Sequence, residues 1–204
     1  MKHLFFILFL LITLTAQAQT KFKVVESEDE NALISHTFVD EHNQTLKTLD
    51  PEKYYTVFYE LDYGYFTVVG ITGTPGWFAI DAHENILFQI YNTSFGEPSP
   101  DYLIENRIRI IDNKGKIGFA NEKGEIIIQP QFELASSFHN GYAIIAENCI
   151  KTPWPGHENC DCHHYSIACK KHGYMDKQGN VIKFGEYAVE QIIDEIGWQP
   201  DQQY

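Results

Sequence analysis

The 204-residue chain is long enough for one domain with a substantial core, and its 28 acidic against 15 basic residues give a net charge of -13 with histidine neutral. A field of this sign repels phosphate backbones and anionic lipid headgroups, because the Lys and Arg residues that release counterions are few and scattered. The composition therefore argues against nucleic acid and membrane surfaces as partners and leaves proteins, neutral glycans, metals and cationic ligands.

Residues 1–18 have the pattern of a secretory signal peptide. A short basic start is followed by an unbroken apolar run over residues 4–12, and small residues lead to Ala18. The run is shorter than the roughly 20 apolar residues that a membrane-spanning helix needs. We therefore expect cleavage after Ala18 and export of residues 19–204 to the periplasm or the extracellular space, without stable membrane insertion.

The next segment, residues 19–59, is acidic and weakly patterned. Its negative charge is concentrated in residues 26–30, and residues 21–25 predict an edge strand.

Three later segments align with one another, at residues 76–88, 116–128 and 171–183. Each combines a short strand, a turn of the form Asp/Asn-x-x-Gly and a second strand rich in β-branched residues, although the first segment keeps Asp81 and loses both glycines. An Asp or Asn side chain closes such a turn on backbone amides, and glycine accepts a positive φ without a Cβ clash. The segments therefore predict three β-hairpins, each covering the face that its neighbour leaves open.

A further strand is expected before each hairpin, at residues 64–69, 106–111 and 141–146. The repeat unit is then strand, turn, strand, turn, strand. The predicted fold class is all-β, with three repeat units over residues 60–184.

The last interval between units is longer than the first. Trp77 and Ile117 are 40 residues apart, whereas Ile117 and His172 are 55 apart. The excess of 15 residues falls in an insertion at 148–168, which is expected to be a loop too polar and too rich in Pro and Gly to pack alone.

The second unit resembles the WG-repeat family of bacterial proteins, whose units read Gly-Lys-Trp-Gly-Tyr-Ile-Asp-x-x-Gly-x-x-Val-Ile-x-Pro-x-Phe and later Phe-x-x-Gly-x-Ala. The match runs from Gly115 to Ala143. The tryptophan that names the family survives as Trp77, while Ile117 and His172 stand at its other two positions. The resemblance implies a β-rich repeat module and no shared catalytic site.

The C-terminal tail, residues 185–204, predicts one short amphipathic helix that packs on the last unit. The helical spacing is carried by Ala188, Ile192, Ile193 and Ile196.

The insertion and its flanks hold all four cysteines. Outside the cytoplasm an even number of cysteines is more often paired than free, so two disulfides are expected. Cys149 and Cys169 flank the insertion, which favours pairing them across its base. That pairing leaves Cys160 with Cys162 in a small strained ring, so the connectivity stays open.

A metal site is the alternative use of the same segment. Residues 160–164 read Cys-Asp-Cys-His-His and place several donors for Zn or Cu close together. Cys-x-Cys is, however, not the Cys-x-x-Cys spacing of a zinc knuckle, and no second knuckle follows. A redox-active Cys-x-Cys pair is a third reading, without a thioredoxin-like pattern to support it. The candidate metal ligands are His157, Cys160, Cys162, His163, His164 and Cys169.

Five tyrosines alternate through the strands expected at residues 54–65, so some of them face outward unless both faces are covered. Exposed aromatic rings suit stacking on sugars or anchoring a protein partner, and core packing is the plainer alternative. The five are Tyr54, Tyr55, Tyr59, Tyr63 and Tyr65.

The usual local marks of hydrolase, metalloprotease and nucleotide chemistry are missing from the sequence. We therefore expect no catalytic residue and no cofactor. The leading hypothesis is an exported, non-enzymatic binding or scaffolding module for a protein or a cell-surface glycan. The alternative is a Zn- or Cu-binding envelope protein that uses the Cys/His-rich insertion.

Overall fold

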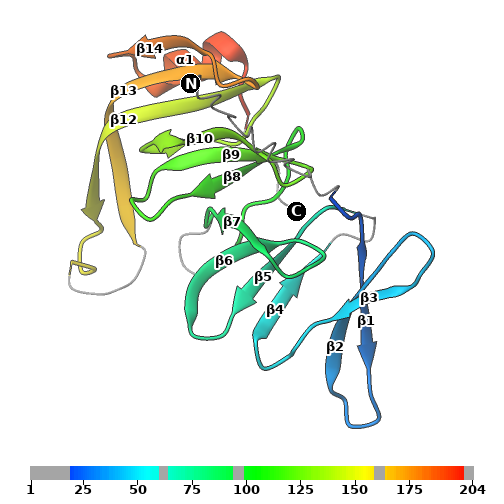
Figure 1. The fold of residues 1–204 in the computed structure, drawn as a ribbon. Helices are drawn as coiled ribbons and strands as arrows, with labels where there is room; N and C mark the ends of the chain where they lie inside the picture. Colours follow the sequence, from blue (N-terminus) through cyan, green and yellow to red (C-terminus); the bar gives the residue numbers. More distant parts are fainter. Residues whose placement is uncertain (1–18, 60–63, 94–98, 159–163, 200–204) are drawn as a thin grey trace, which may run out of the picture.

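The computed structural model describes residues 19–59, 64–93, 99–158 and 164–199. These residues form 14 strands in antiparallel sheets and one short C-terminal helix, so the predicted all-β fold class is confirmed (Figure 1). The predicted signal peptide lies outside the described residues. Among the helices in the described part of the chain, none is long and apolar enough to cross a membrane.

Three antiparallel sheets follow one another along the molecule (Figure 1). The first contains β1 (Lys23–Glu28), β2 (Ile34–Val39) and β3 (Thr45–Thr48). The second contains β4 (Tyr54–Phe58), β5 (Thr67–Ile71), β6 (Thr74–Ile80), β7 (Ile86–Ile90), β8 (Arg107–Ile111), β9 (Ile117–Asn121) and β10 (Ile126–Phe132). The third contains β11 (Leu134–Ala135), β12 (Tyr142–Pro153), β13 (Tyr165–Asp176) and β14 (Val181–Gly185). Neighbouring strands in each sheet are consecutive in sequence, so every sheet is a meander.

The hairpin turns are built by the side chain that the repeat pattern places there. Asn121 Oδ1 accepts hydrogen bonds from the backbone N–H groups of Lys123 and Glu125, at 3.0 and 2.9 Å, and Gly124 follows the turn with a φ of 77°. Asp81 and Asp176 make the corresponding pairs of bonds. The turn prediction holds because these bonds are local and need no distant partner.

The N-terminal arm contains the same turn, which was not predicted from the sequence. Asp40 Oδ1 accepts hydrogen bonds from the N–H groups of His42 and Gln44, at 2.9 and 2.8 Å, and Asn43 takes the glycine position with a φ of 58°. The strands β1, β2 and β3 therefore form a further three-stranded unit before the three predicted ones. The turn residues Asp40, Asp81, Asn121 and Asp176 are 41, 40 and 55 residues apart.

Buried apolar side chains form three clusters along the sheets. The first joins the N-terminal unit to β5 and β6 through Phe22, Val24, Phe38, Leu49, Tyr54, Val69, Ile80 and Ala82. The second lies within the seven-stranded sheet and contains Val68, Trp77, Ala79, Phe88, Ile90, Ile108, Ile110 and Ala120. The third joins β9 and β10 to β12 and β13 through Ile117, Phe119, Ile128, Phe132, Ala135, Phe138, Ala143, Ile145 and Met175. Because each cluster spans neighbouring units, each unit is stabilised by apolar packing against the next.

The predicted C-terminal helix is present as α1 (Val189–Ile196), shorter than the tail of residues 185–204. It contacts β12 and β13 of the last unit and buries Ile192. The helix ends at Gly197, whose φ of 61° gives the left-handed cap that stops it. Trp198 then donates a hydrogen bond from Nε1 to the carbonyl of Ser137 at 3.0 Å, which ties the end of the helix to the third sheet.

The insertion at 148–168 is not the loop that its composition predicts. The strands β12 and β13 continue into it over residues 148–153 and 165–168, and their pairing runs from Tyr142 opposite Asp176 to Pro153 opposite Tyr165. We call β12 and β13 together the hairpin arm. Their far ends project beyond the rest of the third sheet in Figure 1. The prediction was wrong because it counted polar and Pro residues and did not weigh the backbone ladder that adjacent paired strands extend.

Candidate functional site

A groove of about 650 Å³ lies between the start of β1, the strands β4, β5 and β8, and residues 99–103. This volume falls in the range of about 300–1,000 Å³ that small-ligand sites occupy. We call it the aromatic groove, because five rings line it in addition to the buried Phe22: Phe58, Tyr59, Tyr65, Phe66 and Tyr102. Phe58 is 41% exposed and Tyr102 is 38% exposed, so part of this ring surface is open to solvent.

The first wall of the groove is fixed by the backbone of Phe22. Its N–H donates to the carbonyl of Gly64 and its carbonyl accepts from the Gly64 N–H, both at 2.8 Å. The Phe22 side chain is buried and its ring lies 4.3 Å from that of Phe38. This wall is therefore anchored both to β4–β5 and to the N-terminal unit.

The opposite wall is fixed by a buried ion pair. Asp101 accepts two hydrogen bonds from the Arg109 side chain, from Nε at 2.9 Å and from Nη2 at 2.8 Å, and a third from the Arg109 backbone N–H at 2.8 Å. Arg109 also donates to the carbonyl of Ala135 at 3.2 Å and lies over the ring of Tyr91 at 4.8 Å. Residues 99–103 are thereby attached to β8 by side chains that are almost fully buried.

Polar groups stand at the edge of the groove beside the rings. The Lys21 ammonium lies 5.9 Å from the centre of the Tyr65 ring, near the outer limit of a cation–π contact. Thr67 donates from Oγ1 to the carbonyl of Phe58 at 2.6 Å. The Tyr59 hydroxyl donates to Glu26 at 3.1 Å, and burial together with this carboxylate raises the pKa of Tyr59. Tyr59 is therefore a neutral phenol at neutral pH.

The structure separates the five tyrosines that the sequence singles out. Tyr59 and Tyr65 line the groove, whereas Tyr54 is buried in the first core cluster. Tyr55 is 56% exposed and its ring lies over Gly70, outside the groove. Tyr63 lies outside the described residues.

Sequence reasoning misses the other three groove rings, Phe58, Phe66 and Tyr102. Phe66 lies in the strand predicted at residues 64–69 and directly precedes β5, and Phe58 ends β4, but Tyr102 follows a segment without a strand pattern. Its position depends on the link between Asp101 and Arg109, which no local motif indicates.

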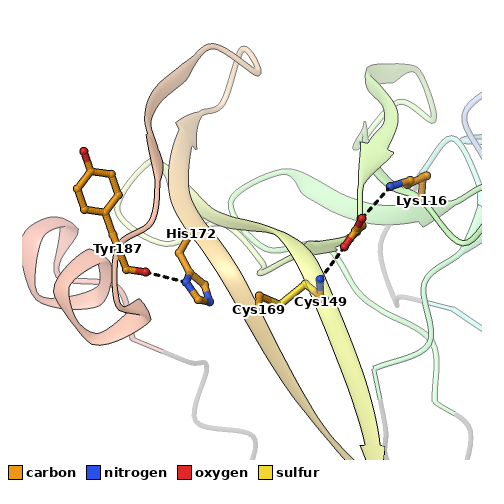
Figure 2. Close-up of a disulfide and its surroundings, with 6 residues drawn as sticks. Lys116, Cys149, Cys169, His172 and Tyr187 are labelled. Atoms are coloured by element: carbon orange, nitrogen blue, oxygen red, sulfur yellow. Dashed lines mark hydrogen bonds and ion pairs between the residues drawn. A yellow bond between two sulfur atoms is a disulfide. The ribbon is translucent and has the colours of Figure 1, made fainter.

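In the hairpin arm, the structure pairs Cys149 with Cys169 in a disulfide, with the two Cα atoms 3.9 Å apart (Figure 2). This is the pairing that the flanking positions favoured. Glu133 accepts a hydrogen bond from the Cys149 N–H at 2.9 Å and lies 3.6 Å from the Lys116 ammonium. The Cys149 N–H, assisted by Lys116, lowers the pKa of Glu133 below its ordinary value. The Glu133 carboxylate thus links the disulfide to the second repeat unit.

Three of the six candidate metal ligands lie outside the described residues: Cys160, Cys162 and His163. A disulfide pairing of Cys160 with Cys162 stays a prediction. The disulfide takes Cys169 out of the predicted set of metal ligands, because a bonded sulfur is not a thiolate. His172, on β13, points away from the arm and its Nδ1 contacts the carbonyl of Tyr187 at 2.9 Å (Figure 2).

The two remaining candidate ligands lie together at the tip of the arm. The rings of His157 and His164 have centroids 4.4 Å apart, and His164 also packs against Trp154 at 5.3 Å. Nδ1 of His164 is shielded from solvent and has no hydrogen-bond partner among the residues that the structure describes. Within the described residues, no group of three or more His, Cys, Asp or Glu side chains is arranged to hold a metal ion.

Comparison with known proteins supports the architecture. Residues 117–148 match the family model described as the WG containing repeat. The match covers β9, β10, β11 and the first part of β12, which are the second hairpin and the strand that follows it. Comparisons with curated proteins and with solved structures gave no match. The chain therefore contains a WG repeat at residues 117–148.

Proposed function

We propose that this chain is an exported, non-enzymatic binding module for a protein or a cell-surface glycan, and that the aromatic groove is its ligand site. The observation that carries the proposal is the groove itself. It offers about 650 Å³ beside five aromatic rings, and two of those rings are more than a third exposed. Rings with one accessible face are common anchors of ligands and of protein partners.

A binding role is favoured over catalysis by how the polar groups of the groove are used. Asp101 is committed to Arg109, and the Tyr59 hydroxyl is committed to Glu26. Thr67 donates its hydroxyl proton to a backbone carbonyl of the neighbouring strand. These three side chains therefore hold the walls of the groove in place, and none of the three forms the nucleophile–base pair that covalent or acid–base catalysis requires.

Export is part of the proposal and has two supports. The pattern of residues 1–18 is that of a cleavable secretory signal. The Cys149–Cys169 disulfide persists in oxidising compartments such as the periplasm or the extracellular space, and it is rare in the cytoplasm.

The test is capture of ligands from the native envelope and extracellular fractions by the immobilised chain. The wild-type protein is compared with Tyr65→Ala/Tyr102→Ala, which removes two groove rings, and with Tyr187→Ala, which removes a half-exposed ring on the C-terminal side. Proteins and glycans that are retained are identified by mass spectrometry. The expected result is a ligand held by the wild type and by Tyr187→Ala and lost by the groove variant. Identical ligands on all three proteins would contradict the proposal.

One observation favours a second candidate function, a Zn- or Cu-binding role for the hairpin arm. The rings of His157 and His164 have centroids 4.4 Å apart, and within the described part of the chain Nδ1 of His164 is shielded without a hydrogen bond. A shielded imidazole nitrogen is a ready ligand for either metal. This candidate requires stoichiometric Zn or Cu in protein purified from the oxidising compartment, and loss of that metal in His164→Ala. A metal-free protein would remove it.

A further inference from the structure

We infer that the ligand of the aromatic groove is a neutral oligosaccharide whose rings stack on Tyr65. This inference rests on the proposed binding function and narrows it to one chemical class. It depends on three features of the groove: the mixture of ring faces and polar edges, the balance of charges, and the use of the nearby backbone groups.

The first feature is the alternation of rings with polar groups. A pyranose with equatorial hydroxyls has an apolar face of axial C–H bonds and a polar rim, so it stacks on an aromatic ring while its hydroxyls reach groups beside that ring. Tyr65 supplies such a ring, and the Lys21 ammonium stands 5.9 Å from its centre. Ser99 and Glu122 add hydrogen-bonding groups to the lining. A purely apolar ligand would leave these three polar side chains without new partners.

The second feature is charge. The chain carries a net charge of -13, yet the charges at the groove balance once Arg109, the partner of Asp101 behind the lining, is counted. Lys21 stands against Glu122 in the lining, and Asp101 is neutralised by Arg109. Neither an acidic nor a basic ligand gains from this balance, and either would lose part of its hydration on entry. The groove therefore fits an uncharged ligand.

The third feature argues against an extended peptide strand. A peptide that adds to a sheet edge needs unpaired backbone N–H and C=O groups. At the groove, the N–H and carbonyl of Phe22 are both bonded to Gly64, and the carbonyl of Phe58 already accepts from Thr67. A peptide would thus find these ladder positions occupied, whereas a sugar needs only ring faces and side-chain polar groups.

The experiment uses cellotriose and N,N′,N″-triacetylchitotriose as probes, because both are neutral and have equatorially substituted β-linked rings. Trigalacturonic acid is the charged comparison. Binding to the full chain, purified from the oxidising compartment, is measured by saturation-transfer NMR and by calorimetry. We expect at least one neutral trisaccharide to bind, and trigalacturonic acid to bind more weakly than it.

Three variants test the assigned ring. Tyr65→Ala should weaken the binding by about tenfold, because the stacked face is lost. Tyr65→Phe should keep the binding, since it preserves the ring and removes only the hydroxyl. Tyr187→Ala is the matched control and should bind as the wild type does. Circular dichroism and thermal melting establish that each variant is folded before its binding is compared. If Tyr65→Ala does not fold, Tyr65→Leu takes its place, because leucine keeps apolar packing and removes the aromatic face.

The inference is overturned if neither neutral trisaccharide binds, if trigalacturonic acid binds as tightly, or if folded Tyr65→Ala retains full affinity. The capture experiment then separates the two proposals. If the groove retains a protein and binds no sugar, the proposed binding function is supported and the saccharide inference is wrong. If no captured ligand depends on the groove, both proposals are wrong.

Discussion

Asp101 and Arg109 make a three-bond contact in which the carboxylate accepts from Nε, from Nη2 and from the backbone N–H of the same arginine. Only 2% of the Asp101 side chain and 15% of the Arg109 side chain are exposed. A pair this buried is costly to desolvate, so its value lies in position: it fixes residues 99–103 against β8 as a wall of the aromatic groove.

Removing one partner of this pair should cost far more than removing both. Asp101→Ala leaves the Arg109 guanidinium buried without its carboxylate, and we expect a loss of about 3–5 kcal/mol in the free energy of unfolding. The double variant Asp101→Ala/Arg109→Met should lose less than Asp101→Ala alone. Urea unfolding of the two single variants and the double variant measures the coupling. Additive losses would show that the two side chains act independently.

Glu84 connects the first repeat turn to the N-terminal unit and should make stability depend on pH. Its carboxylate lies 2.9 Å from the Lys47 ammonium and 3.5 Å from that of Lys53. Although burial raises the pKa of Glu84, its hydrogen bonds with Lys47 and Tyr54 and the charges of both lysines bring that pKa below its ordinary value of 4.5.

A carboxyl whose pKa is lower in the folded state stabilises the fold above its unfolded pKa, and this contribution is lost as the pH falls through the folded value. Glu84→Gln should therefore lower the free energy of unfolding by about 1 kcal/mol at pH 7, and the gap to the wild type should close below about pH 4. Urea unfolding at pH 7 and pH 3 measures both gaps. Glu41→Gln, in the exposed Asp40 turn, is the control. A gap for Glu84→Gln that is the same at both pH values would contradict the assignment.

Gly118, the glycine that follows the tryptophan position of the repeat motif, has a steric reason to be glycine. A Cβ on Gly118 would stand 2.5 Å from the backbone nitrogen of Pro130 and would also meet the carbonyl of Ile128, where β10 leaves regular register with β9. Backbone atoms cannot move aside as a flexible side chain does. The glycine therefore lets the irregular part of β10 lie directly on β9.

Gly118→Ala should cost about 2–3 kcal/mol of unfolding free energy through this clash. The control is Gly115→Ala, where a Cβ meets nothing within 4 Å but the φ of 75° is unfavourable for alanine. That strain alone should cost about 1 kcal/mol. Thermal and urea unfolding of both variants give the comparison. A smaller loss for Gly118→Ala than for Gly115→Ala would exclude the close strand approach as the reason for the glycine.

The sequence predicts the hairpins well because their turns are closed by neighbouring atoms. It misses the N-terminal unit because Asn43 replaces the turn glycine, and it finds the first repeat less clearly because Glu84 does the same. Both residues adopt positive φ values, 58° and 61°, in turns of the same form. Asn tolerates this conformation better than most residues, so Asp-x-x-Asn in residues 40–43 was the available signal.

The aromatic groove is beyond the reach of local patterns. Its walls come from segments about 80 residues apart, Lys21 and Phe22 on one side and Tyr102 and Leu103 on the other. They meet only because the N-terminal unit packs on β5 and because Asp101 binds Arg109. The alternating tyrosines indicated aromatic surface, but which rings share a site is decided by packing between sheets.

The Cys149–Cys169 disulfide divides the hairpin arm into two parts with different support. On the side of the core, Ile144 and Ile145 of β12 are buried, and Ile145 belongs to the third core cluster. Beyond the disulfide, residues 150–153 of β12 are exposed and pair only with residues 165–168 of β13. The outer part therefore depends on the covalent closure, while the inner part depends on packing.

Reduction of the disulfide should therefore loosen the outer arm and leave the repeat core intact. Closing the 20 residues that separate Cys149 from Cys169 removes unfolded-state entropy worth about 3 kcal/mol. In the reduced protein, amide hydrogen exchange should rise in residues 150–152 and 165–168 and stay slow in residues 142–147. The β-type circular dichroism spectrum should change little. If Cys160 and Cys162 are paired as well, the non-reduced protein should weigh four hydrogens less than the reduced one. Four titratable thiols in protein recovered under oxidising conditions would refute the pairing and would favour metal binding by the arm, because free thiolates are the ligands that Zn and Cu need there.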